Sequence, residues 1–522
     1  MDESRIPILV GCSQITQRED DPAKALSPMD LTEAAARQAA VDAGAGDALL
    51  KALDTVLVIR SFSDTSWRFA SPFGQSTNPP RTLAQRLGAA DARRQIYTFP
   101  GGNMVQWSIN RMFEMITQGQ LGTALIAGGE ALSTQKAAQR GGLELDWNED
   151  PGGQPEMWGV ETRGWNDVED RHRMAGAIFA YPLFENALRH HKGRTVAEHG
   201  AKLGELFARF AAVAAANPLA DRRDGFSAKQ IASVGPDNPY IGFPYTKLMN
   251  ANAFIDQSAA LILTSVAKAK ALGIAQDKWV YLHGCSDTYD HWFISDRKDF
   301  HSSPAMRVAG VEALAMADCG LDDIGAFDIY SCFPSAVQLA CQELGLALDD
   351  PRGLTITGGL PYHGGANAYV MNAIAAMVDK VRGNPGTFGI VTANGGYLTE
   401  HAAGIYSTEP SPIPKSGEAP WSREDPGIDQ AKIDATPHPD LAEAANGAGV
   451  IETYTVGFGR DNQPNKGIVI GRLGDGSDPN ATRFLANTPV DQDLFAAMTG
   501  EDFLGAPGKV SHQDGRNIFT PN

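Results

Sequence analysis

The 522-residue sequence has no apolar run of about 18 residues, the length that a membrane-spanning helix needs, so no membrane partner is expected. Its N-terminus is acidic and is followed by an apolar run too short for a signal peptide, which favours a cytoplasmic protein. Positive charge is also scarce. The net charge of −18 and the lack of a basic cluster argue against a nucleic-acid partner.

Cysteine is the next scarce residue. The five cysteines are odd in number and widely spaced, and no CxxC or Cys/His metal-binding spacing occurs: Cys12, Cys285, Cys319, Cys332 and Cys341. Neither a disulfide framework nor a zinc site is therefore indicated, and we expect no metal.

Apolar strands alternate with helical segments through most of the chain, which predicts an α/β protein with a largely parallel sheet. One unit occurs twice. In the first copy, Pro100-Gly101-Gly102-Asn103 precedes a helix over 104–117 and a strand over 124–127 that ends in Gly128-Gly129. In the second, a glycine turn around His363 precedes a helix over 366–381 and a strand over 387–392. This internal repeat predicts two related halves whose helix N-termini face a common pocket.

Two glycine turns in the second copy suggest a site. They are Gly358 to Gly365 and Asn394-Gly395-Gly396, and a histidine lies beside each, His363 and His401. Glycine lets the backbone approach a ligand closely, and a helix start offers free N–H groups to developing negative charge. Two tight turns with surface histidines are the alternative.

Two further regions interrupt the repeat. Residues 133–249 form a helical insertion that holds most of the clustered cations, among them Arg173, Arg189 and His190. They are either a solvated surface or a cap that supplies cations for a phosphorylated cofactor. Prolines mark a linker at 409–421, and short strands beyond it predict a small β-rich domain over 422–522, a five-strand barrel.

Local sequences resemble the thiolase superfamily, specifically the sterol-carrier-protein-type thiolase-like proteins, over about 1–408. The tail resembles the additional C-terminal domain of thiolase-like proteins of type 1. The matching segments, in the family's order, are LIAGGEALS, LMNANAFIDQSAALIL, YSCF (residues 330–333), YHGGAN (362–367) and ANGG (393–396).

The resemblance implies a thiolase-like α/β fold. Two related βαβαβαββ halves in five layers would carry the helical insertion and a C-terminal β-rich, OB-like domain. The expected divisions are 1–265 for the N-terminal half, including the insertion at 133–249, 266–408 for the C-terminal half, 409–421 for the linker and 422–522 for the additional domain.

Both catalytic cysteines of thiolases are missing. The nucleophile's position falls at Gly102 or Asn103, and the second cysteine's position falls at Ala393. Cys332 matches a non-catalytic cysteine of the family and is expected to be a small core residue. Two-step thiolysis through an acyl-cysteine is therefore not expected.

Without the two cysteines, the resemblance still predicts a pocket. Its expected catalytic residues are His363, in the family's oxyanion role, with Tyr330, Asn394 and His401. Oxyanion or substrate contacts are assigned to Gly102, Asn103, Ser331, Cys332, Tyr362 and Gly395. Coenzyme A contacts are assigned to Lys247 and Asn250.

Three functions stay open on this evidence. The first is CoA-dependent retro-Claisen cleavage of a 3-oxo acid or 3-oxoacyl-CoA, an acyltransferase reaction with CoA or acetyl-CoA as substrate. The second is a retro-aldol reaction on a 3-hydroxyacyl-CoA. The third is non-catalytic acyl-CoA binding by a degenerate thiolase. The chain is expected to be a monomer or a homodimer.

Overall fold

The computed structural model describes residues 2–65, 67–410, 421–478 and 480–522. Its first half forms a six-stranded sheet in the order β1-β8-β4-β2-β3-β5. The strands are β1 (Pro7–Thr16), β2 (Thr55–Val58), β3 (Arg94–Thr98), β4 (Thr123–Ala131), β5 (Glu156–Trp158) and β8 (Asp256–Ser265). Apolar runs predict most of these strands, because helices cover both faces of the sheet, but the short and largely exposed β5 has no such run and was not predicted.

The second half forms a four-stranded sheet in the order β10-β11-β12-β9. Its strands are β9 (Tyr281–Tyr289), β10 (Ile324–Asp328), β11 (Phe388–Gly395) and β12 (Glu400–Ser407). Reciprocal backbone hydrogen bonds of 2.9 Å between Leu9 and Val280 join the two sheets.

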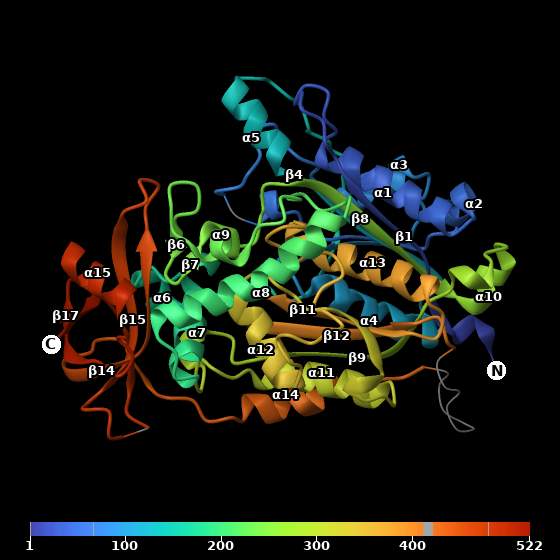
Figure 1. Ribbon diagram of the computed structural model, residues 1–522. Coiled ribbons are helices and arrows are strands. Elements are labelled where there is room, and N and C mark those ends of the chain that lie inside the picture. The colour runs from blue at the N-terminus through green and yellow to red at the C-terminus, as the bar shows by residue number, and fades with distance from the viewer. Residues whose placement is uncertain (1, 66, 411–420, 479) are drawn as a thin grey trace.

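Five layers stack from top to bottom in Figure 1, so the thiolase-like fold is confirmed. Outer helices cover the first sheet, two central helices lie between the sheets, and further helices cover the second sheet. The outer helices on the first sheet are α1 (Pro28–Asp42), α2 (Gly46–Lys51) and α3 (Pro79–Arg86). The central helices are α4 (Met104–Thr117) and α13 (Tyr369–Gly383). The helices on the second sheet are α11 (Pro304–Met316), α12 (Pro334–Leu344) and α14 (Pro426–Asp434). A short helix, α10 (Val266–Ala271), follows β8.

The central helices bind the halves together. From α4, Gln106 accepts a 2.7 Å hydrogen bond from Tyr406 of the second sheet. From α13, the Met371 methyl group lies 3.2 Å from the Cβ position of Gly128 in the first sheet. The repeated helices predicted from sequence therefore lie side by side in the middle layer, and their N-termini lie near the glycine turns.

The second sheet has one strand fewer than a full repeat within the described residues. At the place of the missing strand, the Ile329 N–H donates to the carbonyl oxygen of Leu354 at 2.9 Å. The next residues bond to a side chain instead, because Asp328 accepts the N–H groups of Ile356 and Thr357 at 3.0 and 3.2 Å.

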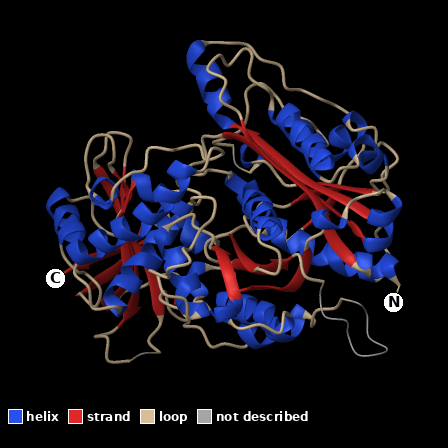
Figure 2. Cartoon of the chain, turned by 45° about the vertical axis from the view of Figure 1, so that its right-hand side comes forward, coloured by secondary structure: helices blue, strands red, loops and turns tan. Residues whose placement is uncertain are grey.

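The C-terminal residues form a closed five-stranded barrel, as predicted. Its strands are β14 (Gly447–Phe458), β15 (Pro464–Leu473), β16 (Arg483–Asn487), β17 (Pro507–Gln513) and β18 (Arg516–Pro521). Closure follows from the pairing, since β14 pairs with β15 and β17, and β16 joins β15 to β18. A short strand, β13 (Leu441–Ala442), and a helix, α15 (Gln492–Gly500), complete the region. Figure 2 shows this third group of strands apart from the other two sheets.

The insertion connects the barrel to the rest of the protein. It contains α5 (Leu132–Gly141), α6 (Asp167–Arg171), α7 (Ala177–His191), α8 (Val196–Ala216), α9 (Ala228–Ala232), β6 (Tyr240–Gly242) and β7 (Tyr245–Thr246). Strand β6 pairs with β14 of the barrel. Arg189 and His190 both contact Asp502, at 2.6 and 2.9 Å, so these two side chains link the insertion to the barrel region.

The predicted linker at 409–421 lies mostly outside the described residues, and the domain boundaries stay predictions. No helix among the described residues combines the length and the apolar character of a membrane span.

Candidate functional site

The loop before α4 leaves no space for a nucleophilic side chain. A Cβ atom on Gly102 would lie 2.2 Å from the Tyr330 hydroxyl oxygen and 2.5 Å from the carbonyl oxygen of Asn394. Both distances are far below van der Waals contact. Gly102, one of the two positions assigned to the catalytic cysteine, is thus closed by a tyrosine hydroxyl from the second half.

Tyr330 follows β10 and is fixed by its surroundings. Its N–H donates to Thr392 Oγ1 at 2.9 Å, and its ring meets the edge of Tyr369, with centroids 5.7 Å apart. Its hydroxyl makes no hydrogen bond to another described residue. Burial raises the pKa of Tyr330 well above its usual value. The hydroxyl is therefore protonated at neutral pH and available as a donor.

His363 also packs against Tyr369, with ring centroids 6.1 Å apart. Its backbone is held from the first half, since its carbonyl accepts from Gln257 Nε2 at 2.8 Å. Neither ring nitrogen hydrogen bonds to another described residue. Burial lowers the pKa of His363 to about 4, so the ring is neutral at pH 7. A neutral imidazole can donate one hydrogen bond to an oxyanion.

The glycine turn before His363 is shaped by close packing. A Cβ on Gly358 would lie 2.5 Å from Ala214 of α8, and its φ of +106° favours glycine. Ser331 Oγ accepts a hydrogen bond from the Leu360 N–H at 3.2 Å and so stabilises this turn. Tyr362 is buried beside Phe207 of α8, with ring centroids 6.4 Å apart, and its hydroxyl lacks a described partner.

Sequence reasoning missed Glu400, the first residue of β12. Its carboxyl group lies between the two glycine loops, 3.3 Å from the Cβ position of Gly101 and 3.0 Å from that of Gly395. Asn103 Nδ2 donates to it at 3.5 Å. Burial raises the pKa of Glu400 to about 7, against the opposing effect of Asn103. A carboxyl group with this pKa can act as base or acid at neutral pH.

The raised pKa of Glu400 predicts a pH-dependent change in stability. The folded protein retains a proton that the unfolded chain loses above about pH 4.5, so the stabilisation is complete below pH 4.5 and is lost as the pH rises through about 7. Glu400→Gln removes this titration. Relative to the wild type, its free energy of unfolding should rise by about 2 kcal/mol between pH 5 and pH 6.5 in urea titrations. Parallel pH profiles of the two proteins would contradict the raised pKa.

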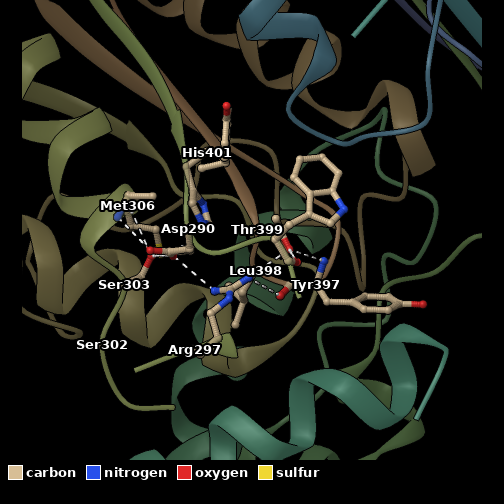
Figure 3. A network of polar contacts seen from close by, with 12 residues as sticks. Asp290, Arg297, Ser302, Ser303, Met306, Tyr397, Leu398, Thr399 and His401 are labelled. Atoms are coloured by element: carbon tan, nitrogen blue, oxygen red, sulfur yellow. Dashed lines mark hydrogen bonds and ion pairs between the residues drawn. The ribbon is translucent and has the colours of Figure 1, made fainter. Parts of the chain in front are cut away.

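His401 follows Glu400 and therefore faces the opposite side of the sheet. Its Nε2 lies 3.6 Å from Asp290 Oδ2, beside the start of α11. Arg297 Nη1 lies 3.3 Å from the same carboxylate, and Figure 3 shows the network. Burial would raise the pKa of Asp290, but His401 and Arg297 together lower it. The structure thus separates His401 from Glu400 and Asn103, because neighbours in a strand point to opposite faces.

The Asn394 side chain shares this reverse face, and only its carbonyl oxygen approaches Gly102. Asn394 Nδ2 donates to the hydroxyl of Tyr181 at 3.0 Å and lies 3.7 Å from Cys332 Sγ. Tyr181 donates in turn to the Gly396 carbonyl at 3.2 Å. Burial raises the pKa of the Cys332 thiol to about 12, which keeps it neutral. These contacts position the turn between β11 and β12.

A small cavity lies between these strands and helices α11 and α12. Its lining includes Tyr330, Asn394, His401, Met306 and Ala336. Its volume of about 20 Å³ is enough for about one water molecule. Tyr330 is thus shared by this cavity and by the glycine loops. An acyl chain would need movement of the surrounding side chains to enter here.

Lys247 and Asn250 lie on the segment that leads into β8. Lys247 is exposed. Asn250 Nδ2 donates to the Thr246 carbonyl at 2.6 Å, while Ala251 N–H donates to Cys332 at 3.0 Å. This segment therefore borders the site without filling it. The described carboxylates close enough to share a metal ion lie away from the site: Glu312 is on α11, Glu424 precedes α14 and Asp429 is on α14.

The additional domain and the whole chain have clear relatives. Residues 430–516 match the thiolase-like protein type 1 additional C-terminal domain. A monomeric SCP2-thiolase-like protein type 1 from Mycobacterium smegmatis is 35% identical over 100% of both chains, with a TM-score of 0.83. No curated protein sequence matches the chain.

More distant structures share the fold of the two halves. An Ltp2-ChsH2(DUF35) aldolase is 17% identical, with a TM-score of 0.56 over 77% of this chain and 98% of its own. Human mitochondrial 3-ketoacyl-CoA thiolase in complex with CoA is 17% identical, with a TM-score of 0.53 over 78% of this chain and 98% of its own.

Proposed function

The chain belongs to the SCP2-thiolase-like proteins of type 1, and we propose that it cleaves a carbon–carbon bond of a 3-oxoacyl-CoA with CoA and without an acyl-enzyme. The observation that carries this proposal is the Tyr330 hydroxyl at the Cβ position of Gly102. Because a nucleophilic side chain has no space there, the incoming thiol must attack the substrate directly.

Glu400 is the base in this reaction. It takes the proton of the CoA thiol, and the thiolate attacks carbon 3 of the substrate. The N–H groups of Gly102 and Asn103 have no described backbone partner and can stabilise the resulting oxyanion, as free N–H groups at a helix start do.

Collapse of this intermediate breaks the bond between carbons 2 and 3. A shortened acyl-CoA leaves, and the electron pair stays on the enolate of acetyl-CoA. Neutral His363 donates a hydrogen bond to the enolate oxygen. Tyr330 protonates carbon 2 and regains a proton from Glu400, so that one 3-oxoacyl-CoA and one CoA give two acyl-CoA products.

A retro-aldol reaction is the second candidate, because the buried hydroxyl of Tyr330 and the carboxyl of Glu400 supply acid and base without any external nucleophile. The substrate would then be a 3-hydroxyacyl-CoA, and the products an aldehyde or ketone and a shorter acyl-CoA. Cleavage without added CoA distinguishes this reaction from the retro-Claisen one.

The test is product analysis by mass spectrometry. Full-length protein is incubated with a 3-oxoacyl-CoA and CoA, and separately with the 3-hydroxyacyl-CoA alone. Acetyl-CoA and the shortened acyl-CoA should form together, and only when CoA is present. Binding of CoA without any product would favour a non-catalytic acyl-CoA-binding protein and overturn the proposed reaction.

We also expect a monomer. The Mycobacterium smegmatis relative is described as monomeric. Light scattering would show a single mass of about 56 kDa, consistent with the 55.7 kDa chain, and a dimer mass would contradict this expectation.

A further inference from the structure

Helix α7 of the insertion begins beside the candidate site. Its residue Tyr181 is buried, and the hydroxyl group contacts the turn between β11 and β12. The hydroxyl donates to the Gly396 carbonyl at 3.2 Å. It accepts hydrogen bonds from Asn394 Nδ2 at 3.0 Å and from the Leu398 N–H at 3.4 Å. One side chain of the insertion therefore holds this turn at three residues.

The backbone of this turn is strained. Leu398 has a φ of +55°, in the left-handed region that residues other than glycine rarely adopt. Such a conformation persists only where the surrounding structure enforces it. Arg297 Nη2 also supports the turn, since it donates to the Tyr397 carbonyl at 3.3 Å and to Thr399 Oγ1 at 3.0 Å, as Figure 3 shows. The conformation of the turn thus depends on side chains outside it.

The two ends of the turn carry groups that lie against the Gly102 loop. At the β11 end, the carbonyl oxygen of Asn394 lies 2.5 Å from the Cβ position of Gly102. At the β12 end, the carboxyl group of Glu400 lies 3.0 Å from the Cβ position of Gly395. A shift of the turn would therefore move Glu400 relative to the loop where the substrate carbonyl is proposed to bind.

The middle of α7 is fixed by a buried polar network. Glu185, one helical turn after Tyr181, is completely buried. Its carboxylate accepts hydrogen bonds from the Tyr245 hydroxyl at 2.7 Å and from Gln338 Nε2 at 2.6 Å. His199 Nε2 lies 2.6 Å from the same carboxylate. These partners belong to β7, α12 and α8, so α7 cannot turn or slide without breaking the network.

The same helix contacts the barrel. Thr453 Oγ1 of β14 donates to the Leu183 carbonyl at 2.5 Å, and Asn186 Nδ2 donates to the carbonyl of the residue after Thr453 at 2.9 Å. Arg189 forms the ion pair with the barrel region described above. Because a helix rises 1.5 Å per residue, all three contacts lie within about 12 Å of Tyr181 along the axis. Figure 1 shows α7 between the barrel and α12.

We propose that Tyr181 is a positioning residue for Glu400, and that the additional domain holds Tyr181 in place through α7. The effect on catalysis rests on the proposed function, in which Glu400 is the base. The link itself is independent of the reaction, because one helix joins the barrel to the β11–β12 turn. The barrel thereby acts on the site without contacting the substrate.

Hydrogen exchange measured by mass spectrometry tests the Tyr181 contact without any substrate. Tyr181→Phe keeps the ring, which stacks on Phe333 with centroids 4.4 Å apart, and removes only the hydroxyl. Exchange in the peptide 394–400 of the full-length protein should become about tenfold faster, because the Leu398 N–H loses its acceptor. Exchange at the wild-type rate would show that Tyr181 does not hold the turn.

Two threonines of β14 form a matched pair for the barrel contact. Thr453 and Thr455 are completely buried, and each donates to a backbone carbonyl. Thr453 bonds to α7, whereas Thr455 bonds to Phe243, outside α7. Thr453→Val should make exchange at 394–400 about threefold faster or more, and Thr455→Val should leave it unchanged. The same rate in both variants would overturn the role of the barrel.

Kinetics test the role in catalysis. In Tyr181→Phe, kcat for carbon–carbon cleavage should fall by about tenfold while KM for CoA stays within about twofold, because a misplaced base slows the reaction without weakening binding. Burial raises the pKa of Glu400 to about 7. Water admitted by a looser turn would lower this pKa, so the rise of kcat with pH should move to lower pH by about one unit. The strand partner Tyr289 stays protonated in this range, since burial raises its pKa.

The outcomes separate the two proposals. If exchange at 394–400 changes as expected but the wild type forms no cleavage products, the link between barrel and turn stands and the proposed function fails. If the wild type cleaves its substrate and Tyr181→Phe keeps the wild-type kcat and pH profile, the proposed function stands and Tyr181 is not a positioning residue.

Discussion

Replacing Tyr330 by phenylalanine should lower kcat for carbon–carbon cleavage by about 10²- to 10⁴-fold, the usual contribution of a general acid. The ring keeps its packing against Tyr369, and only the hydroxyl at the Gly102 loop is lost. CoA affinity should therefore stay within about twofold of the wild type. Steady-state kinetics with a 3-oxoacyl-CoA, together with CoA titration, measure the two effects separately.

Tyr289→Phe is the matched control, because Tyr289 is partly exposed at the end of β9 and its hydroxyl makes no described hydrogen bond. It should retain full activity. If Tyr330→Phe also turns over at the wild-type rate, Tyr330 is not the acid, and the proton must reach carbon 2 from another group.

Restoring the cysteine that thiolases carry should damage this protein. In Gly102→Cys the new Cβ would meet the Tyr330 hydroxyl and the Asn394 carbonyl at 2.2 and 2.5 Å. Overpacking of this kind lowers the free energy of unfolding by about 3 kcal/mol. Urea denaturation measures the loss, and thiolase activity should not appear.

A double variant identifies the cause of that loss. Tyr330→Ala removes one of the two clashing groups. The double variant Gly102→Cys/Tyr330→Ala should therefore lose less free energy of unfolding than the two single variants lose together, by about 1 kcal/mol or more. Gly200→Cys is the control, because nothing lies within 4 Å of the Cβ position of Gly200. Additive losses would show that Tyr330 does not occupy the cysteine's place.

The halves and the barrel were predictable because their signals are local and repeated. Glycine turns, a helix and an apolar strand occur in the same order around Gly102 and around His363. Short strands separated by glycine also predicted the barrel. The shorter sheet of the second half was not predictable. The Asp328 carboxylate accepts the N–H groups of Ile356 and Thr357 in place of a neighbouring strand, and such a contact has no sequence pattern.

The site was predicted only in part. Gly102 and Tyr330 lie in contact and His363 shares the Tyr369 ring with Tyr330, whereas His401 and the side chain of Asn394 lie on the reverse face. Strand alternation separates Glu400 from His401, but every residue of β12 is buried, so the pattern does not show which face is the inner one. Glu400 was missed for this reason. Its role depends on burial and on Asn103, which is distant in sequence.

The most direct test of the account is intact-protein mass spectrometry after rapid quenching during turnover of a 3-oxoacyl-CoA with CoA. The account predicts that acetyl-CoA and the shortened acyl-CoA accumulate while the protein keeps its unmodified mass throughout. An acyl adduct that forms and decays at the rate of turnover, on Cys332 or on any other residue, would contradict it.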